Sequence, residues 1–247
     1  MTRSDPARRF FVEGTRAVGD LVEIDASDAH KIARVLRLHS GDHIEIVDSS
    51  ATAFDAELEL APRAVRARLV EALAANSSAS GLALDVAQAI PKAARMEFVI
   101  EKGTELGASG FLPFYSERSV RREVGAEKLA RWRRLARTAS AQCGRREVPE
   151  VREPVEFDAL LAALDRYDAV LFAWELASGE PLRERLRTAL PGTGRALIVI
   201  GPEGGFTHSE AEKAVRHGAT LISLGPRILR TDTAAMALLA VIGALAS

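Results

Sequence analysis

Hydrophobic and polar positions follow two different rhythms along the chain. Up to about residue 72, short apolar runs alternate with polar positions between turn residues, a pattern typical of β-strands. Strands are predicted at residues 10–12, 21–24, 43–47, 53–60 and 65–70. Ala29, Ile32 and Leu36 recur at helical spacing and predict one helix, with Ser27 as its expected N-cap. Several short strands at this spacing predict a small β-barrel.

From residue 82 onward, strands alternate with helices. Strands are predicted at residues 82–90, 110–115, 169–174, 197–200 and 221–224, and helices at 92–106, 126–142, 157–164, after Pro181, between Thr207 and Gly218, and at 234–246. This alternation predicts the α/β class, with a mostly parallel sheet covered by helices. The small polar residues at 73–81 are typical of a linker, so we predict domains at residues 1–74 and 75–247.

Two glycine loops lie within residues 197–236. Residues 201–205 (GPEGG) follow one predicted strand, and residues 225–226 (Gly-Pro) follow the next. Neither loop has the spacing of a P-loop or of a dinucleotide fingerprint. If the two strands are neighbours, both loops lie at the carboxyl edge of the sheet, where open α/β folds bind ligands. A plain turn remains the alternative for each loop.

Charged residues favour the ligand-binding interpretation of this edge. Arg227, Arg230 and Asp232 stand between a strand and a wholly apolar helix, where burial is costly unless they pair or serve a site. Trp174 and Glu175 end another predicted strand and could reach the same crevice. A rim position without a function is the alternative for these two residues.

Charge must be interpreted locally, because the net charge of -1 gives no whole-molecule argument for nucleic acid. The densest arginine region surrounds the helix predicted at 126–142, and the first domain has basic residues near its helix. Arginine binds phosphate bidentately, although a solvated surface offset by glutamates is the alternative. The candidates for nucleic-acid contact are Arg8, Arg9, Arg34, Arg37, Arg118, Arg121, Arg122 and Arg145.

Other features exclude several classes of protein. The one cysteine, Cys143, cannot form an internal disulfide, and the five histidines lack a metal-binding spacing, so no metal is expected. The first residues do not resemble a signal peptide. The apolar helix at 234–246 is shorter than the roughly 20 residues that span a bilayer. We therefore expect a cytoplasmic protein of 247 residues, with no membrane partner, whose 47% hydrophobic content supports a substantial core.

Six segments together resemble one family. They are residues 30–37 (HKIARVLR), 101–107 (EKGTELG), 116–119 (SERS), 142–145 (QCGR), 201–205 (GPEGG) and 224–234 (LGPRILRTDTA). In this order they resemble the ribosomal RNA small-subunit methyltransferase E family of the SPOUT class, over nearly the whole chain. The resemblance implies a PUA-like (OB-like) barrel, a homodimer and a C-terminal trefoil knot, which the rarity of knots would otherwise argue against.

The resemblance also implies an activity: transfer of a methyl group from S-adenosylmethionine to N3 of a uridine in 16S rRNA. The cofactor residues expected from it, with the strand end at 174–175, are Trp174, Glu175, Gly201, Glu203, Gly204, Gly205, Leu224, Gly225, Ile228, Leu229, Arg230 and Ala234. One departure is Asp232, where relatives carry glutamate. Two alternatives remain: a SPOUT enzyme acting on another RNA base, and a non-catalytic RNA-binding protein that keeps the fold.

The implied chemistry selects two catalytic candidates. N3 of neutral uracil carries a proton, so the site needs a base, or donors that stabilise negative charge on O2 and O4. Arg230 is the first candidate for the electrostatic role. A normal arginine is not a base, so Glu203 or Glu175 would accept the proton if either lies within hydrogen-bond reach.

Overall fold

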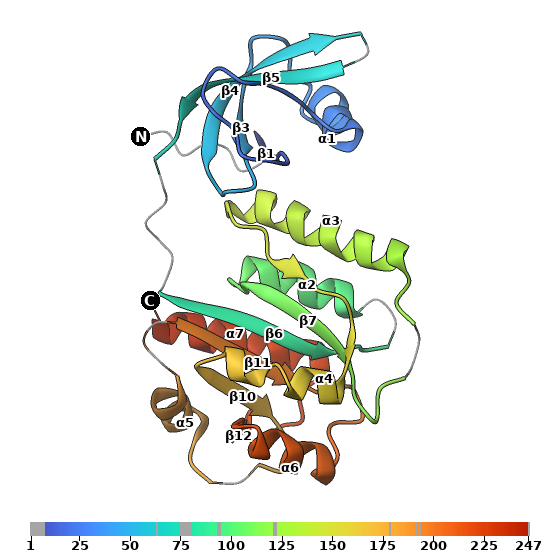
Figure 1. Cartoon of the computed structure of the whole chain (residues 1–247), viewed down its shortest axis with the longest axis vertical. Coiled ribbons are helices and arrows are strands. Elements are labelled where there is room, and N and C mark those ends of the chain that lie inside the picture. The colour runs from blue at the N-terminus through green and yellow to red at the C-terminus, as the bar shows by residue number, and fades with distance from the viewer. Residues whose placement is uncertain are drawn as a thin grey trace. The chain divides into compact units, whose positions relative to one another are not determined.

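The computed structural model describes residues 8–62, 64–74, 81–92, 95–120, 123–177, 179–190, 192 and 194–246. The chain forms two compact units (Figure 1). Unit 1 comprises Met1–Ser77 and Ser140–Glu147, and unit 2 comprises Ser78–Ala139 and Val148–Ser247. The sequence did not assign the second segment of unit 1. The domain boundary predicted after residue 74 adjoins residues 75–80, which lie outside the described residues.

Unit 1 contains a curled sheet that, within the described residues, has five strands in the order β1-β3-β4-β5-β2. Their bounds are β1 Arg9–Phe11, β2 Leu21–Glu23, β3 His43–Val47, β4 Ala53–Ala61 and β5 Ala64–Ala72. β1 pairs in parallel with β3, and the other pairs are antiparallel. The predicted strands are confirmed. Among the described residues no pairing joins β1 to β2, so a closed PUA-like barrel stays a prediction.

The helix of unit 1 begins earlier than predicted. Helix α1 covers Ala26–His30, and a π-helical turn, η2, continues it over Lys31–Val35. The predicted N-cap Ser27 is wrong, because Asp25 is the N-cap and its carboxylate accepts from the backbone N–H groups of Ser27 and Asp28. An aspartate placed two residues earlier satisfies these free N–H groups first, and the Ser27 hydroxyl donates to the same carboxylate.

A buried ion pair explains why the segment at 140–147 belongs to unit 1. Arg9 is 5% exposed, and its guanidinium lies 2.8 Å from the carboxylate of Glu45. Arg9 also donates to the backbone oxygen of Arg145, and Arg146 donates to the backbone oxygen of Ala74. Removing one partner of such a pair leaves an uncompensated buried charge, which is strongly destabilising. These contacts therefore tie the segment to the sheet of unit 1.

Unit 2 is built on a parallel sheet. In the described part of the chain, its seven strands run in the order β12-β10-β11-β6-β7-β8, with β9 paired to β7, and every pair is parallel. Their bounds are β6 Leu82–Ala89, β7 Gly110–Tyr115, β8 Glu150–Val151, β9 Val155–Glu156, β10 Ala169–Ala173, β11 Gly194–Ile200 and β12 Thr220–Ile222. The helices are α2 Arg95–Glu105, α3 Ala126–Cys143, α4 Phe157–Leu161, α5 Leu182–Ala189, α6 His208–Arg216 and α7 Thr231–Ala246, with a 3-10 turn, η3, at Leu164–Arg166.

Helices cover both faces of this sheet, which confirms the predicted α/β class. Successive side chains of a strand point to opposite faces, so β11 places Ile198 and Ile200 in one core and Leu197 and Val199 in the other. The first core includes residues of α2, α3, α5 and α7, and the second includes residues of α4 and α6. None of the helices in the described ranges is long and apolar enough to cross a membrane.

The order of the strands corrects one expectation. The two glycine loops were expected to follow neighbouring strands, but β10 lies between β11 and β12. Periodicity along a chain does not determine which strands pair, because the connections between parallel strands can cross over others. The consequence for the site is favourable: the end of β10, with Trp174 and Glu175, lies between the two loops.

Gly103 provides a test of how tightly α2 packs against β7. A Cβ atom on Gly103 would lie 2.8 Å from a ring carbon of Phe111, which is fully buried. We expect Gly103→Ala to lower the free energy of unfolding by about 2 kcal/mol, since overpacking outweighs the helix propensity of alanine. Urea unfolding measures this change. Gly243→Ala in α7, where nothing lies within 4 Å of the added carbon, should instead stabilise; a stabilising Gly103→Ala would contradict the packing described.

Candidate functional site

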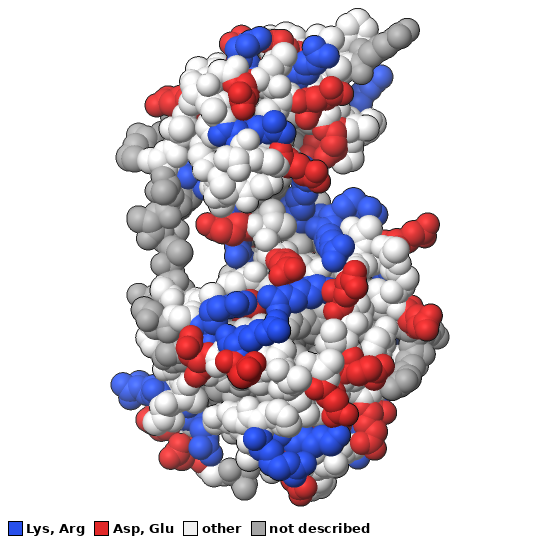
Figure 2. Space-filling model, viewed as in Figure 1, with Lys and Arg blue, Asp and Glu red and all other residues white. Residues whose placement is uncertain are grey.

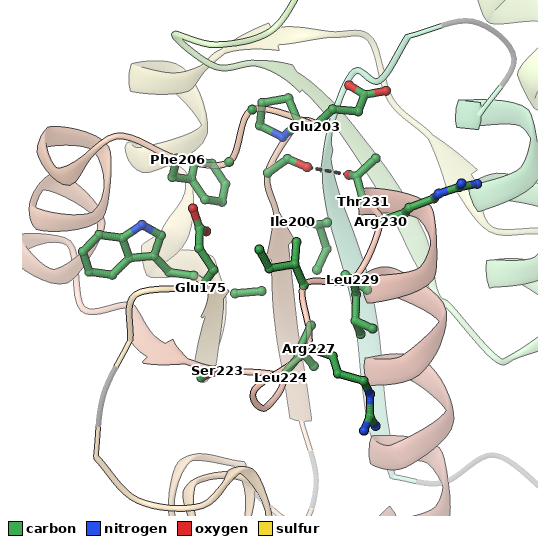
Figure 3. A pocket seen from close by; sticks show the side chains of 18 of the residues that line it. Glu175, Ile200, Glu203, Phe206, Ser223, Leu224, Arg227, Leu229, Arg230 and Thr231 are labelled. Carbon is green, nitrogen blue, oxygen red and sulfur yellow. Dashed lines mark hydrogen bonds between the residues drawn. The ribbon is translucent and has the colours of Figure 1, made fainter.

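A cavity of about 610 Å³ lies at the carboxyl ends of β10, β11 and β12 (Figure 3). Its walls are residues 173–175 at the end of β10, residues 200–206 at the end of β11, and residues 223–231 from the loop after β12 to the first residue of α7. Arg95 from the start of α2 and Ala234 from α7 complete the lining. The volume is typical of a site for a small molecule. The edge of the sheet that the sequence selected therefore holds a cavity.

All the residues predicted to bind a cofactor line this one cavity. They are Trp174, Glu175, Gly201, Glu203, Gly204, Gly205, Leu224, Gly225, Ile228, Leu229, Arg230 and Ala234. Among the lining residues that the sequence missed are Arg95, Phe206 and Thr231. Thr231 stands inside the motif at 224–234 and could have been found there, whereas no motif marks Arg95. The binding roles themselves stay predictions.

The loop after β11 needs glycine for two physical reasons. A Cβ atom on Gly201 would lie 3.0 Å from the ring of Phe206, which is 2% exposed and lies 4.1 Å from the ring of Phe172. Gly205 has a φ of +66°, in the left-handed region that other residues rarely adopt. The N–H group of Gly205 also donates to the oxygen of Pro202, which closes a tight turn. The packing thus fixes the shape of this wall.

Thr231 links the two glycine loops. Its hydroxyl donates to the backbone oxygen of Gly201, as the dashed line in Figure 3 shows. The same hydroxyl accepts a hydrogen bond of 2.8 Å from the side-chain amide of Gln88, a fully buried residue near the end of β6. A buried hydroxyl that both donates and accepts in this way restrains the backbone segments that it joins. The start of α7 is therefore fixed against the first loop.

Glu203 is directed toward the start of α2. Its Oε1 accepts a hydrogen bond of 3.0 Å from the backbone N–H of Lys92, and it lies 3.4 Å from the guanidinium of Arg95. In Figure 3 its carboxylate lies apart from that of Glu175. This oxygen is already occupied by donors, so the geometry favours a role in holding the loop. Its predicted role as proton acceptor remains untested.

Glu175 has a different environment. Its Oε1 would be only 2.6 Å from a Cβ atom on Gly205, so the carboxylate lies directly against the backbone of the glycine loop. Within the described part of the chain, no hydrogen bond or ion pair engages it. A carboxylate accepts hydrogen bonds through two oxygens. Glu175 therefore offers acceptors to a ligand in the cavity.

Arg230 places a positive charge at the edge of the cavity. Its side chain is exposed and points away from Glu175 in Figure 3, at the start of α7. Arg227 lines the cavity from the same loop, but Asp232, which the sequence grouped with both arginines, is not a lining residue. The Asp232 carboxylate instead accepts from the N–H of Thr233 in the first turn of α7, where the helix dipole favours negative charge.

Four of the predicted nucleic-acid residues are exposed in the structure. Arg8, Arg34 and Arg37 are exposed in unit 1, and Arg118 is exposed in unit 2, where it also donates to the oxygen of Gly204. On the faces visible in Figure 2, acidic side chains are interspersed with basic ones in each unit. On this face, an RNA surface would therefore depend on local arginine clusters, as the net charge indicated.

The other four predicted nucleic-acid residues are either at least partly buried or outside the described residues. Arg9 is buried against Glu45, so its predicted RNA contact is not supported and we withdraw it. Its place in an apolar strand, β1, could have suggested burial. Arg145 is half-buried, and burial lowers the pKa of its guanidinium. Arg121 and Arg122 lie outside the described residues.

Comparisons with known proteins agree with this geometry. The model of the RNA methyltransferase domain family matches residues 78–243. The chain is 34% identical to the ribosomal RNA small subunit methyltransferase E of Bacillus subtilis, over 92% of each chain. It is similar to the crystal structure of a ribosomal RNA small subunit methyltransferase E from Neisseria gonorrhoeae bound to S-adenosyl methionine, with a TM-score of 0.84, 28% identity and coverage of 96% and 97%. The chain is also similar to the structure of a protein from Legionella pneumophila named as a methyltransferase, in complex with the same cofactor. The TM-score is 0.85 and the identity is 30%, with coverage of 99% of this chain and 98% of that chain.

Proposed function

The chain belongs to the RNA methyltransferase family that includes the ribosomal RNA small subunit methyltransferases E, and from this premise we propose its reaction. It uses S-adenosylmethionine to methylate N3 of a uridine in 16S rRNA of the small ribosomal subunit. The main support is that the twelve residues predicted for the cofactor line a single cavity at the carboxyl edge of the sheet. Relatives solved with this cofactor cover nearly the whole chain.

The residues present fit such a cofactor. The cavity of about 610 Å³ lies within the range of sites for molecules of this size. Backbone groups of the two glycine loops can pair with an adenine edge, and the free carboxylate of Glu175 can accept from ribose hydroxyls. When bound, the cofactor supplies an electrophilic methyl group on a sulfonium. The protein must then hold the uracil ring in line with that methyl group.

The uridine nitrogen must lose its proton before or during the reaction. The lone pair of neutral N3 is delocalised, so N3 becomes a good nucleophile only as its proton leaves. The negative charge that then develops on O2 and O4 needs a hydrogen-bond donor or a positive charge nearby. Arg230 lies at the edge of the cavity with its guanidinium exposed, and it is our candidate for that role. Glu175 would be the proton acceptor only if its oxygens do not bind the ribose hydroxyls, while Glu203 is engaged by Lys92 and Arg95.

We propose that unit 1 helps to hold RNA through Arg8, Arg34 and Arg37, and that the active form is a homodimer. Ile228 beside the cavity is 91% exposed, and Val241 and Leu245 of α7 are also exposed. Val241 and Leu245 are four residues apart, so they share one face of α7, and large apolar side chains exposed on one face are typical of a protein contact. Sedimentation at micromolar concentration tests the dimer, and a monomer under these conditions would contradict it. The trefoil knot likewise remains part of the proposal.

Two experiments separate the proposed function from its alternatives. Mass spectrometry of small-subunit RNA from cells with and without this protein should find one N3-methyluridine that disappears; loss of a different modified base would instead indicate another target. Calorimetry with S-adenosylmethionine tests the cofactor. No binding at high micromolar concentration would favour a non-catalytic RNA-binding protein that keeps the fold.

A further inference from the structure

The buried carboxylate of Glu210 joins two backbone segments beside the cavity without lining it. We infer that Glu210 is a positioning residue for cofactor binding, which acts through Arg118 on the glycine loop at residues 201–205. The inference rests on the proposed function, because it assigns that loop to S-adenosylmethionine. No motif in the sequence marks Glu210 beyond its place in a helix cap.

Glu210 does more than cap its helix. It is 3% exposed, and its Oε2 accepts a hydrogen bond of 2.9 Å from the N–H of Thr207, the N-cap of α6. A capping box requires only this bond and its reciprocal partner. The other oxygen, Oε1, accepts a bond of 2.9 Å from the N–H of Glu117, which lies after β7 and is distant in sequence. Glu210 therefore fixes the segment after β7 to the segment before α6.

The segment held by Glu210 is a tight turn. The N–H of Ser119 donates to the backbone oxygen of Ser116, and the N–H of Ser116 donates to the hydroxyl of Ser119. Both serines are buried. The Thr207 hydroxyl lies 3.2 Å from the carboxylate of Glu117, which adds a second link from this turn to α6. The turn thus has little freedom to move relative to the cap.

Arg118 projects from this turn onto the glycine loop. Its guanidinium donates a hydrogen bond of 2.9 Å to the backbone oxygen of Gly204. A Cβ atom on Gly204 would lie 3.2 Å from the Cβ atom of Arg118, so the two backbones approach closely. The contacts form a continuous path from Glu210 through Glu117 and Arg118 to Gly204, whose loop lines the cavity.

A double-mutant cycle tests this path. Calorimetry with S-adenosylmethionine would compare the wild type with Arg118→Ala, Glu210→Gln and the double variant. Arg118 is exposed, and glutamine is also accepted in capping boxes, so all should fold. We expect the dissociation constant to rise about tenfold for Arg118→Ala and about fivefold for Glu210→Gln. The double variant should bind within about twofold of Arg118→Ala, because both changes break one path.

Kinetics and hydrogen exchange separate positioning from mere stability. Glu210→Gln should raise KM for the cofactor while kcat at saturating cofactor changes less than about twofold, which indicates loss of binding alone. In the unliganded protein it should also speed hydrogen exchange at residues 204–206. Glu212→Gln, an exposed neighbour on α6, is the matched control and should change neither quantity.

The outcomes distinguish the inference from the proposed function. If the wild type binds the cofactor but Glu210→Gln binds as well as wild type, or the two losses multiply in the double variant, the inference is overturned and the function stands. If the wild type binds no cofactor, the proposed function fails and the inference fails with it. Unchanged exchange at residues 204–206 in Glu210→Gln would also overturn the inference.

Discussion

Replacing Arg230 with alanine is expected to lower the rate of methyl transfer about 100- to 1,000-fold, the usual effect of removing one charge-stabilising group. The affinity for S-adenosylmethionine should change less than about threefold, since Arg230 would act only as charge develops on the base. The geometry supports this separation, because the exposed side chain points away from Glu175, the residue expected to bind the ribose of the cofactor.

Single-turnover kinetics with small-subunit RNA, together with calorimetry of the cofactor, measure the two quantities separately. Arg216→Ala removes an exposed arginine from α6, away from the cavity, and serves as the control for a general loss of positive charge. Arg230→Lys keeps the positive charge but lacks the planar guanidinium, so it should react faster than Arg230→Ala and more slowly than the wild type. Equal losses in rate and in cofactor affinity for Arg230→Ala would remove the role assigned to it.

The sequence predicted unit 2 well because its strands bury both faces. A strand such as β11, with Leu197 and Val199 on one face and Ile198 and Ile200 on the other, leaves a continuous apolar run that is easily recognised. The capping box of Thr207 and Glu210 is equally local, and it begins the helix that was predicted between Thr207 and Gly218. Signals confined to neighbouring residues could therefore be interpreted directly.

The missed features depend on contacts between distant residues. The position of β10 between β11 and β12 is set by pairing across the sheet, which no local pattern records. The apolar strand could have suggested burial of Arg9, but its partner Glu45 lies 36 residues away in the sequence and is found only in the folded chain. Gln88 and Thr231, separated by 143 residues, meet only after folding. For the same reason, the cofactor residues were found mainly by resemblance to a family, and Arg95 was not found at all.

Replacing Glu175 with alanine is expected to weaken binding of S-adenosylmethionine about 30-fold, as for the loss of hydrogen bonds to a charged acceptor. The carboxylate lies against Gly205 inside the cavity, and among the described residues nothing engages it. Two oxygens side by side match a pair of hydroxyl donors, so we predict that Glu175 accepts from the vicinal hydroxyls of the ribose. Because no hydrogen bond or ion pair among the described residues is lost, the thermal unfolding midpoint without cofactor should hardly change.

Calorimetry with a cofactor analogue that lacks one ribose hydroxyl identifies the atoms involved. The wild type should bind this analogue more weakly than S-adenosylmethionine, whereas Glu175→Ala should bind the two about equally, since the removed hydroxyl has no acceptor to lose. Glu184→Ala removes an exposed carboxylate from α5, outside the cavity, and should behave as wild type. If Glu175→Ala still discriminates between the two ligands as strongly as wild type, another residue binds the ribose. A normal affinity combined with a slow reaction would instead assign Glu175 to proton transfer, the role that its free oxygens also permit.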